Sequence, residues 1–452
     1  MVYCAAVART EPVPNFLIRW TIQALLAAVL SVVLVEAAVQ IMAAIGRLTT
    51  STASQPGFQL AAPLVVAIVA ALITGGLLYR WQPDAAGEGI PAYLQAVESD
   101  ARLLPLGATL IKYPAAILTL AAYGSGGLVG PLGRVSAGIS QWVSTLLQRS
   151  LPRLFADRDV HHQHYHAPTT AAVSGMAAAV TAIFSAPIAA AVFAVEVVQK
   201  DQLRYHQLVP AALASSATLL LQRSLGWAAP GRMEIPVTDA ATIVILPVVG
   251  LALVAGLIGL LYTGLYRRLA GRLRRNRRRI STRNLVIGML GSACIGLALH
   301  PGLSGTSRDL LQKVLSGEIS GAGLLILPRV SRPELILLAL GAGKLLGNCI
   351  TTGSGMSAGF TAPALFVGAS LGATVALISG FDAGSPGYLV LASSGMAAML
   401  ASVINTPLAA AVLVAELFGI AYAPAATVAS MLAFQVARSR TIYEVALDER
   451  SD

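Results

Sequence analysis

Charged residues are scarce in this sequence. Only 12% of its 452 residues are Asp, Glu, Lys or Arg, whereas 56% are hydrophobic. A soluble protein of this length needs a far more polar surface, so the composition indicates a chain that crosses a membrane several times. We expect the apolar runs to be helices, because a backbone in lipid must satisfy its own hydrogen bonds.

Cysteine is also scarce, and paired catalytic side chains are missing from the apolar segments. Cys4, Cys294 and Cys349 have no paired spacing, which argues against a disulfide framework or a cysteine metal site. We see no nucleophile–base pair and no metal triad in the apolar segments. We therefore expect neither an enzyme nor a resident cofactor.

Acidic residues are outnumbered, and much of the positive excess lies in one segment. Residues 267–283 contain nine arginines and no acid. By the positive-inside rule, this segment is a cytoplasmic loop, an interpretation favoured over a nucleic-acid-binding patch. We expect a multi-pass protein of the cell's inner (plasma) membrane, in contact with the lipid bilayer, with both termini in the cytoplasm and no nucleic-acid partner.

Glycine, by contrast, is abundant and patterned. Residues 124–134 (GSGGLVGPLGR) and 353–363 (GSGMSAGFTAP), which we call the first and second glycine loops, repeat a glycine six residues after the first, at Gly130 and Gly359. Glycine lets a small ion approach main-chain N–H groups. Each loop precedes an apolar segment and so predicts a helix N-terminus, where free N–H groups and the helix dipole hold anions.

The two halves of the chain repeat each other. Residues 175–196 and 395–416 align without a gap, from a shared Gly-Met-Ala-Ala through a central proline to Glu196 and Glu416. This pattern predicts a duplicated architecture with an ion site where the repeats meet. Because the two glutamates are symmetric, a shared structural role is favoured for both.

The expected fold is an all-α polytopic membrane protein with two inverted repeats of short, tilted and broken transmembrane helices. We divide the chain into a cytoplasmic N-terminal segment (1–15), a first half (16–266), an arginine-rich linker (267–283), a second half (284–437) and a cytoplasmic tail (438–452).

The motifs and their order resemble the CLC family of chloride channels and anion/proton transporters. The family's GSGIP, GREGP and GIFAP motifs and its late tyrosine have counterparts in residues 87–91 (GEGIP), 130–134 (GPLGR), 359–363 (GFTAP) and Tyr443. The resemblance covers roughly residues 15–445. It implies a homodimer in which each subunit carries its own pore for a small inorganic anion, chloride or another, as the substrate.

The resemblance also implies which residues surround the ion. Main-chain donors would come from Phe360 and Thr361, and Lys112 would attract anions, unless it is a helix-end lysine that extends to the membrane surface. The expected pore residues are Glu88, Gly89, Ile90, Gly130, Leu132, Gly133, Gly359, Phe360, Thr361 and Tyr443.

Two departures from the family remove its proton-carrying side chains. The gating glutamate of GREGP is Leu132 here, and the final proline of that motif is Arg134. The second proton-handling glutamate corresponds to Val197, next to Glu196. Neither leucine nor valine can bind a proton, so we expect passive or weakly gated anion conduction rather than the usual anion/proton exchange.

A third departure adds a carboxylate. Glu88 stands where the family has a hydroxyl that faces the anion, and an intramembrane carboxylate is usually functional. Three interpretations are open. Glu88 is a relocated gate that occupies the anion site and supports proton-linked transport, or it changes the ion selectivity of the pore, or it caps a helix.

A histidine-rich segment is the best candidate for metal or pH sensing. It contains His161, His162, His164 and His166. The run itself contains no acid of the kind that usually supports an i, i+4 histidine pair in a zinc site, so a solvated loop is favoured. A metal-sensing scaffold is accordingly the weakest functional class, and the glycine loops favour transport over it.

Overall fold

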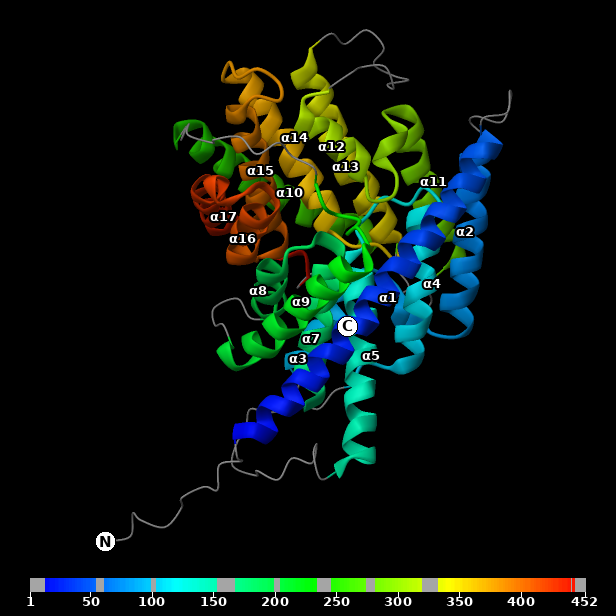
Figure 1. The fold of residues 1–452 in the computed structure, drawn as a ribbon. Coiled ribbons are helices and arrows are strands. Elements are labelled where there is room, and N and C mark those ends of the chain that lie inside the picture. The colour runs from blue at the N-terminus through cyan, green and yellow to red at the C-terminus, as the bar shows by residue number, and fades with distance from the viewer. Residues whose placement is uncertain are drawn as a thin grey trace.

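The computed structural model in Figure 1 is helical throughout its described part. It describes residues 13–53, 61–98, 103–152, 167–198, 204–233, 245–273, 281–318, 332–439 and 441–443. Apart from two isolated β-bridges, these residues form helices, turns and loops. The histidine-rich segment lies outside the described residues.

The helices of the first half of the chain are short or interrupted at several points. Their bounds are α1 (Val13–Ala53), α2 (Ala61–Arg80), η1 (Pro83–Ala85), α3 (Ile90–Glu98), α4 (Leu106–Ala121), α5 (Val129–Ser150), α7 (Ala167–Phe184), α8 (Pro187–Glu196) and α9 (Tyr205–Leu225).

The later helices follow the same order. Their bounds are α10 (Ile245–Leu273), α11 (Thr282–Ala298), η2 (Pro301–Leu303), α12 (Arg308–Ser316), α13 (Pro333–Ser354), α14 (Thr361–Ile378), α15 (Pro386–Ile404), α16 (Pro407–Phe418), η3 (Ile420–Tyr422) and α17 (Ala423–Ala437). In the described part of the chain, eight helices are long and apolar enough to cross a membrane. The all-helical polytopic fold is confirmed.

The duplication is visible in the breaks between helices. Helix α7 ends before Ser185, whose φ is 56°, and α8 starts at Pro187. Helix α15 ends before Asn405, whose φ is 69°, and α16 starts at Pro407. A left-handed residue closes the first helix of each pair, and proline at the first position of the next suits its fixed φ.

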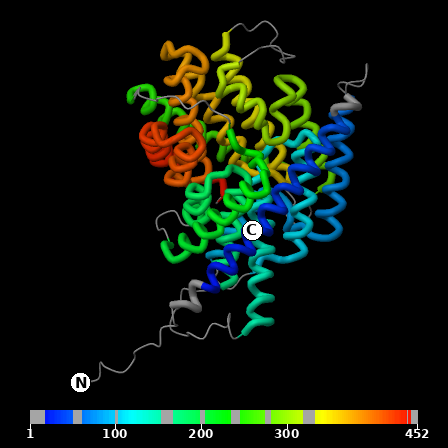
Figure 2. Tube along the Cα trace, in the orientation of Figure 1, coloured from blue at the N-terminus to red at the C-terminus, as the bar shows by residue number. Residues whose placement is uncertain are grey.

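The two halves lie against each other in space. The cyan-to-green helices α5, α7 and α9 lie in the lower part of the molecule and the yellow-to-orange helices in the upper part, while the blue helices run up its right side (Figure 2). The last described residues turn back into the centre, where the side chain of Tyr443 is only 1% exposed. The ion-site candidates therefore come from both repeats and from the end of the chain.

The expected division at residue 266 falls inside a continuous helix. Helix α10 runs through it to Leu273 and packs mainly on α13, α15 and α17, all from the later part of the chain. Helix α1 makes the corresponding contacts with α4, α7 and α9. We therefore propose that the second repeat begins with α10.

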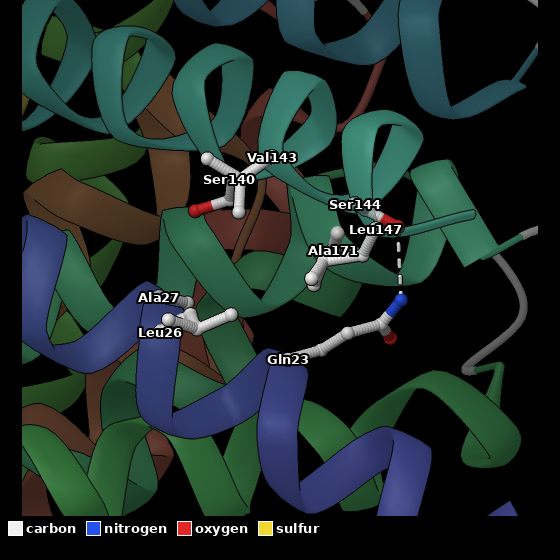
Figure 3. A pocket seen from close by; sticks show the side chains of 8 residues that line it. All are labelled: Gln23, Leu26, Ala27, Ser140, Val143, Ser144, Leu147 and Ala171. Carbon is white, nitrogen blue, oxygen red and sulfur yellow. Dashed lines mark hydrogen bonds between the residues drawn. The ribbon is translucent and has the colours of Figure 1, made fainter. Parts of the chain in front are cut away.

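Helix α1 is fixed across α5 by a seam of polar contacts. Gln23 Nε2 donates to Ser144 Oγ at 2.9 Å, and the hydroxyls of Ser31 and Ser136 share a hydrogen bond. Between these two contacts Ala27 and Ser140 border a cavity of about 10 Å³ (Figure 3). The seam holds the long helix α5, whose N-terminus reaches the centre of the molecule. The cavity is lined by Gln23, Leu26, Ala27, Ser140, Val143, Ser144, Leu147 and Ala171.

Two glutamates each cap the N-terminus of a helix in the other repeat. The Glu196 carboxylate at the end of α8 accepts hydrogen bonds from Leu408 N (3.0 Å) and Ala409 N (2.8 Å), in the first turn of α16. The Glu416 carboxylate near the end of α16 accepts from the main-chain N–H groups of residues 188 and 189 at 3.0 and 2.7 Å, in the first turn of α8. Reciprocal contacts are the mark of a two-fold relation. The shared structural role expected for this pair is confirmed.

We predict that Glu196→Gln and Glu416→Gln destabilise the protein to a similar extent, each by about 1 kcal/mol, the usual worth of a helix N-cap. The measurement is the melting temperature in detergent, followed by tryptophan fluorescence. Glu36→Gln is the matched control, because Glu36 pairs only locally with Gln40 on α1. An unchanged melting temperature in either cap variant would contradict the reciprocal capping.

Candidate functional site

The two glycine loops pair directly through their main chains. Gly127 N donates to Gly359 O and Gly359 N to Gly127 O, each at 2.9 Å. A Cβ on Gly359 would lie 3.0 Å from Gly127 O and 3.1 Å from Gly130 N. Only glycine allows this approach without displacement of a neighbour. The two loops therefore meet, as the sequence predicts for a site between repeats.

In each half, the loop before the short helix also forms main-chain hydrogen bonds with the other half. Gly87, just before α3, donates to Gly355 O at 2.9 Å. Gly305, just before α12, donates to Gly124 O at 2.9 Å and accepts from Gly126 N at 3.0 Å. These bonds satisfy backbone groups that the broken helices leave open inside the membrane.

One part of the second loop differs from the expectation. Gly353 and Ser354 are the last residues of α13, and Gly355, with a φ of 105°, closes that helix. The loop itself is therefore shorter than its sequence match to the first loop indicates, and its helix start at Thr361 is as expected.

Asn348 is a central residue that sequence reasoning missed. Its Nδ2 donates to Ser125 O at 3.0 Å and to Gly359 O at 3.2 Å, and its Oδ1 accepts from the Tyr262 hydroxyl at 2.5 Å. One side chain of α13 thus ties both loops together. A lone Asn in an apolar segment, five residues before Gly353 at the start of the second glycine loop, would have been the only signal.

Three helices begin around these loops. Helix α3 starts at Ile90, α5 at Val129 and α14 at Thr361. The residues at the N-cap positions of α5 and α14, Leu128 and Phe360, have apolar side chains that make no capping hydrogen bond. The first N–H groups of a helix have no intrahelical partner and carry the positive end of its dipole. The site is therefore built to hold negative charge.

The carboxylate of Glu88 lies at this point of convergence. Its side chain is only 3% exposed, and its Oε2 accepts a hydrogen bond from Ile90 N at 2.6 Å. The other oxygen, Oε1, occupies the space that a Cβ on Gly130 would need at the start of α5. Gly89, with a φ of 138°, provides the turn that places the carboxylate there. Glu88 thus spans the N-termini of α3 and α5.

Two hydroxyls and an aromatic cluster complete the site. The Tyr443 hydroxyl is close enough to the Glu88 carboxylate and the Thr361 hydroxyl to interact with both. The Tyr443 ring lies 6.4 Å from that of Phe360, which is also packed edge-on against Tyr266 at 5.0 Å. These rings place the hydroxyl of Tyr443 beside the N-terminus of α14.

Lys112 points inward. Its side chain is fully buried, and its Nζ donates to Ala85 O at 3.1 Å and to Gly87 O. These contacts exclude a lysine that extends to the membrane surface. Lys112 instead holds the loop that carries Glu88.

The remaining expected residues are held by packing and capping contacts. Leu132 is buried in the main hydrophobic core, and a Cβ on Gly133 would contact Met176 of α7. Gly133 therefore serves helix packing. Glu196 is held by α16, and Val197 follows it at the end of α8.

Residues 69–438 match the family model described as voltage gated chloride channel. The chain belongs to the CLC family.

Named relatives of this CLC protein include exchangers and channels. The H(+)/Cl(-) exchange transporter ClcA of Vibrio cholerae is 28% identical over 79% of this chain and 72% of its own length. The chloride/fluoride channel protein of Pseudomonas syringae is 26% identical over 60% of this chain and 56% of its own length. The protein MJ0305 of Methanocaldococcus jannaschii is 27% identical over 84% of this chain and 87% of its own.

Solved CLC structures share the fold. A CLC-type fluoride/proton antiporter superposes with a TM-score of 0.75 at 21% identity, over 95% of this chain and 98% of that chain. A slow cyanobacterial Cl-/H+ antiporter gives a TM-score of 0.73 at 18% identity, over 97% of this chain and 98% of that chain. The expected CLC-like architecture of inverted repeats is confirmed.

We predict that Gly130→Ala is destabilising, by about 1–3 kcal/mol, because the added methyl group overlaps the Glu88 carboxylate. The double variant Gly130→Ala/Glu88→Ser is expected to recover most of this loss, and melting temperatures in detergent measure both. Gly264→Ala is the control, because nothing lies within 4 Å of a Cβ there. A loss that Glu88→Ser leaves unchanged would contradict the contact.

Proposed function

We propose that this CLC protein conducts a chloride-type anion passively or with weak gating, and that the Glu88 carboxylate itself occupies the anion site. The observation that carries the proposal is the position of this carboxylate. It lies where three helix N-termini and the Tyr443 hydroxyl converge, which is the environment that a free anion would require.

The gate works by competition. A carboxylate and a free anion about 4 Å apart repel each other by roughly 4 kcal/mol at an effective dielectric constant of about 20. Glu88 must therefore move out or take up a proton before an anion can bind. Neither Leu132 nor Val197 can supply that proton, so protons control entry without a relay through those two positions.

Proton-linked anion transport is the second candidate. Several relatives and structural neighbours are named as proton-coupled exchangers or antiporters, and Glu88 is itself able to carry a proton. Altered selectivity is the third candidate, and the chloride/fluoride channel among the relatives makes fluoride an ion to test. The capping interpretation is compatible with all three, because Oε2 already bonds the N-terminus of α3.

The assembly and location follow from the family. We propose a homodimer in the inner (plasma) membrane, each subunit with its own pore and both termini in the cytoplasm. Counting of photobleaching steps for singly labelled subunits in liposomes tests the dimer, with two steps expected and one step contradicting it.

We predict that Glu88→Gln raises chloride flux into liposomes by at least about tenfold at neutral pH, because removal of the charge removes the competition. Wild-type flux is expected to rise as the pH falls, and flux through Glu88→Gln to stay constant. Glu36→Gln is the control for a membrane carboxylate outside the site. Equal flux at every pH in wild type and Glu88→Gln would contradict the gate.

The same liposomes distinguish the three candidates. Proton movement recorded during chloride flux is expected to be absent, and a fixed proton-to-chloride ratio would favour the coupled transporter. Fluxes of nitrate, fluoride and potassium define selectivity, and potassium flux without chloride flux would overturn anion conduction.

A further inference from the structure

Among the described residues, three long cationic side chains are less than 2% exposed. Arg134 is 1% exposed, and Lys112 and Lys344 are fully buried. A buried charge is costly unless hydrogen bonds and opposite charge compensate it. The partners of each cation therefore indicate what it stabilises.

The two lysines are counterparts in the two repeats. Lys112 donates to the carbonyls of Ala85 and Gly87, and Lys344 donates to those of Leu303 (3.1 Å) and Gly305 (2.7 Å). Each holds the loop between a short 3₁₀ helix and the following α-helix. Since this contact occurs in both repeats, it belongs to the shared fold and does not depend on a carboxylate.

Arg134 has no such counterpart. When η1 is matched to η2, Thr306 takes the place of Glu88, and when Gly130 is matched to Gly359, Pro363 takes the place of Arg134. The first repeat therefore contains a buried carboxylate, Glu88, and a buried guanidinium, Arg134, that have no counterparts in the second repeat. The opposite charges of Glu88 and Arg134 favour electrostatic compensation of one by the other.

The contacts of Arg134 lead to the same loop. Its Nη1 donates to Asp84 O at 2.8 Å, and its Cβ lies 3.3 Å from where a Cβ on Gly89 would stand. Arg134 therefore approaches the loop on both sides of Glu88, from the second turn of α5. Its bond to residue 84 is made to the main-chain carbonyl of Asp84.

We propose that Arg134 is a positioning residue that keeps Glu88 ionised and seated in the anion site. This inference rests on the proposed function. Among the described residues, the charged or titratable groups that contact Glu88 or its loop are Lys112 from α4, Arg134 from α5 and Tyr443 from the end of the chain. Lys112 has a counterpart in the other repeat and Arg134 has none, so Arg134 is the cation that accompanies Glu88 in this repeat alone.

The test separates the effect of the positive charge at position 134 from the effect of the hydrogen bond that this side chain donates. Arg134→Gln keeps a donor for Asp84 O and removes the charge, and Arg134→Lys keeps the charge. The readout is the pH at which chloride flux into liposomes is half-maximal. We expect Arg134→Gln to move this midpoint up by about one pH unit, equivalent to a tenfold easier protonation, and Arg134→Lys to leave it near the wild-type value.

Two further variants separate this inference from the proposed function. In a Glu88→Gln background, Arg134→Gln is expected to have no effect on the pH dependence of flux, because none remains. Lys344→Gln removes a buried cation from the repeat without a carboxylate and is expected to leave the midpoint unchanged. The elution volume in gel filtration and the melting temperature, both measured in detergent, verify that each variant is folded.

An unchanged midpoint in folded Arg134→Gln would overturn the inference while leaving the proposed function intact, provided that Glu88→Gln still removes the pH dependence. A shift of equal size in Arg134→Gln and Arg134→Lys would also overturn it, because the shift would then follow the side-chain shape and not the charge. If Glu88→Gln retains the pH dependence of wild type, the proposed function itself fails.

Discussion

The main-chain pairing between the two glycine loops is the constraint on which the rest of the structure depends. Broken helices leave N–H and C=O groups open inside the membrane, where water is not available to satisfy them. Gly127 and Gly359 satisfy these groups across the repeats at 2.9 Å, and their lack of side chains permits that distance. The same contact brings the N-termini of α3, α5 and α14 to one point.

The electrostatics of the site follow from that convergence. Helix N-termini and the buried cations Lys112 and Arg134 favour negative charge, and the chain supplies it with Glu88. In a site of this kind a carboxylate and a free anion are alternatives. Under the proposed function, control of access passes to GEGIP, while GPLGR, with Leu132 at its centre, keeps the helix N-terminus without the acid.

Much of the fold could be predicted from the sequence, because its signals are local. Glycine loops, helix-starting prolines and the matched segments ending in Glu196 and Glu416 indicated the repeats, the breaks and the symmetric role of the two glutamates. The partners of these groups are set by tertiary packing, so the crossed caps on α8 and α16 and the contacts of Asn348 could not be read from local pattern. For the same reason, the direction of Lys112 was open until its carbonyl partners were known.

Occupation of the anion site by Glu88 can be tested directly. Anomalous diffraction from bromide-soaked crystals of wild type and Glu88→Gln at neutral pH shows whether bromide binds there. We predict a bromide peak beside Ile90 N, Thr361 and Tyr443 in Glu88→Gln and none there in wild type. Equal bromide occupancy at that position in both proteins would contradict it.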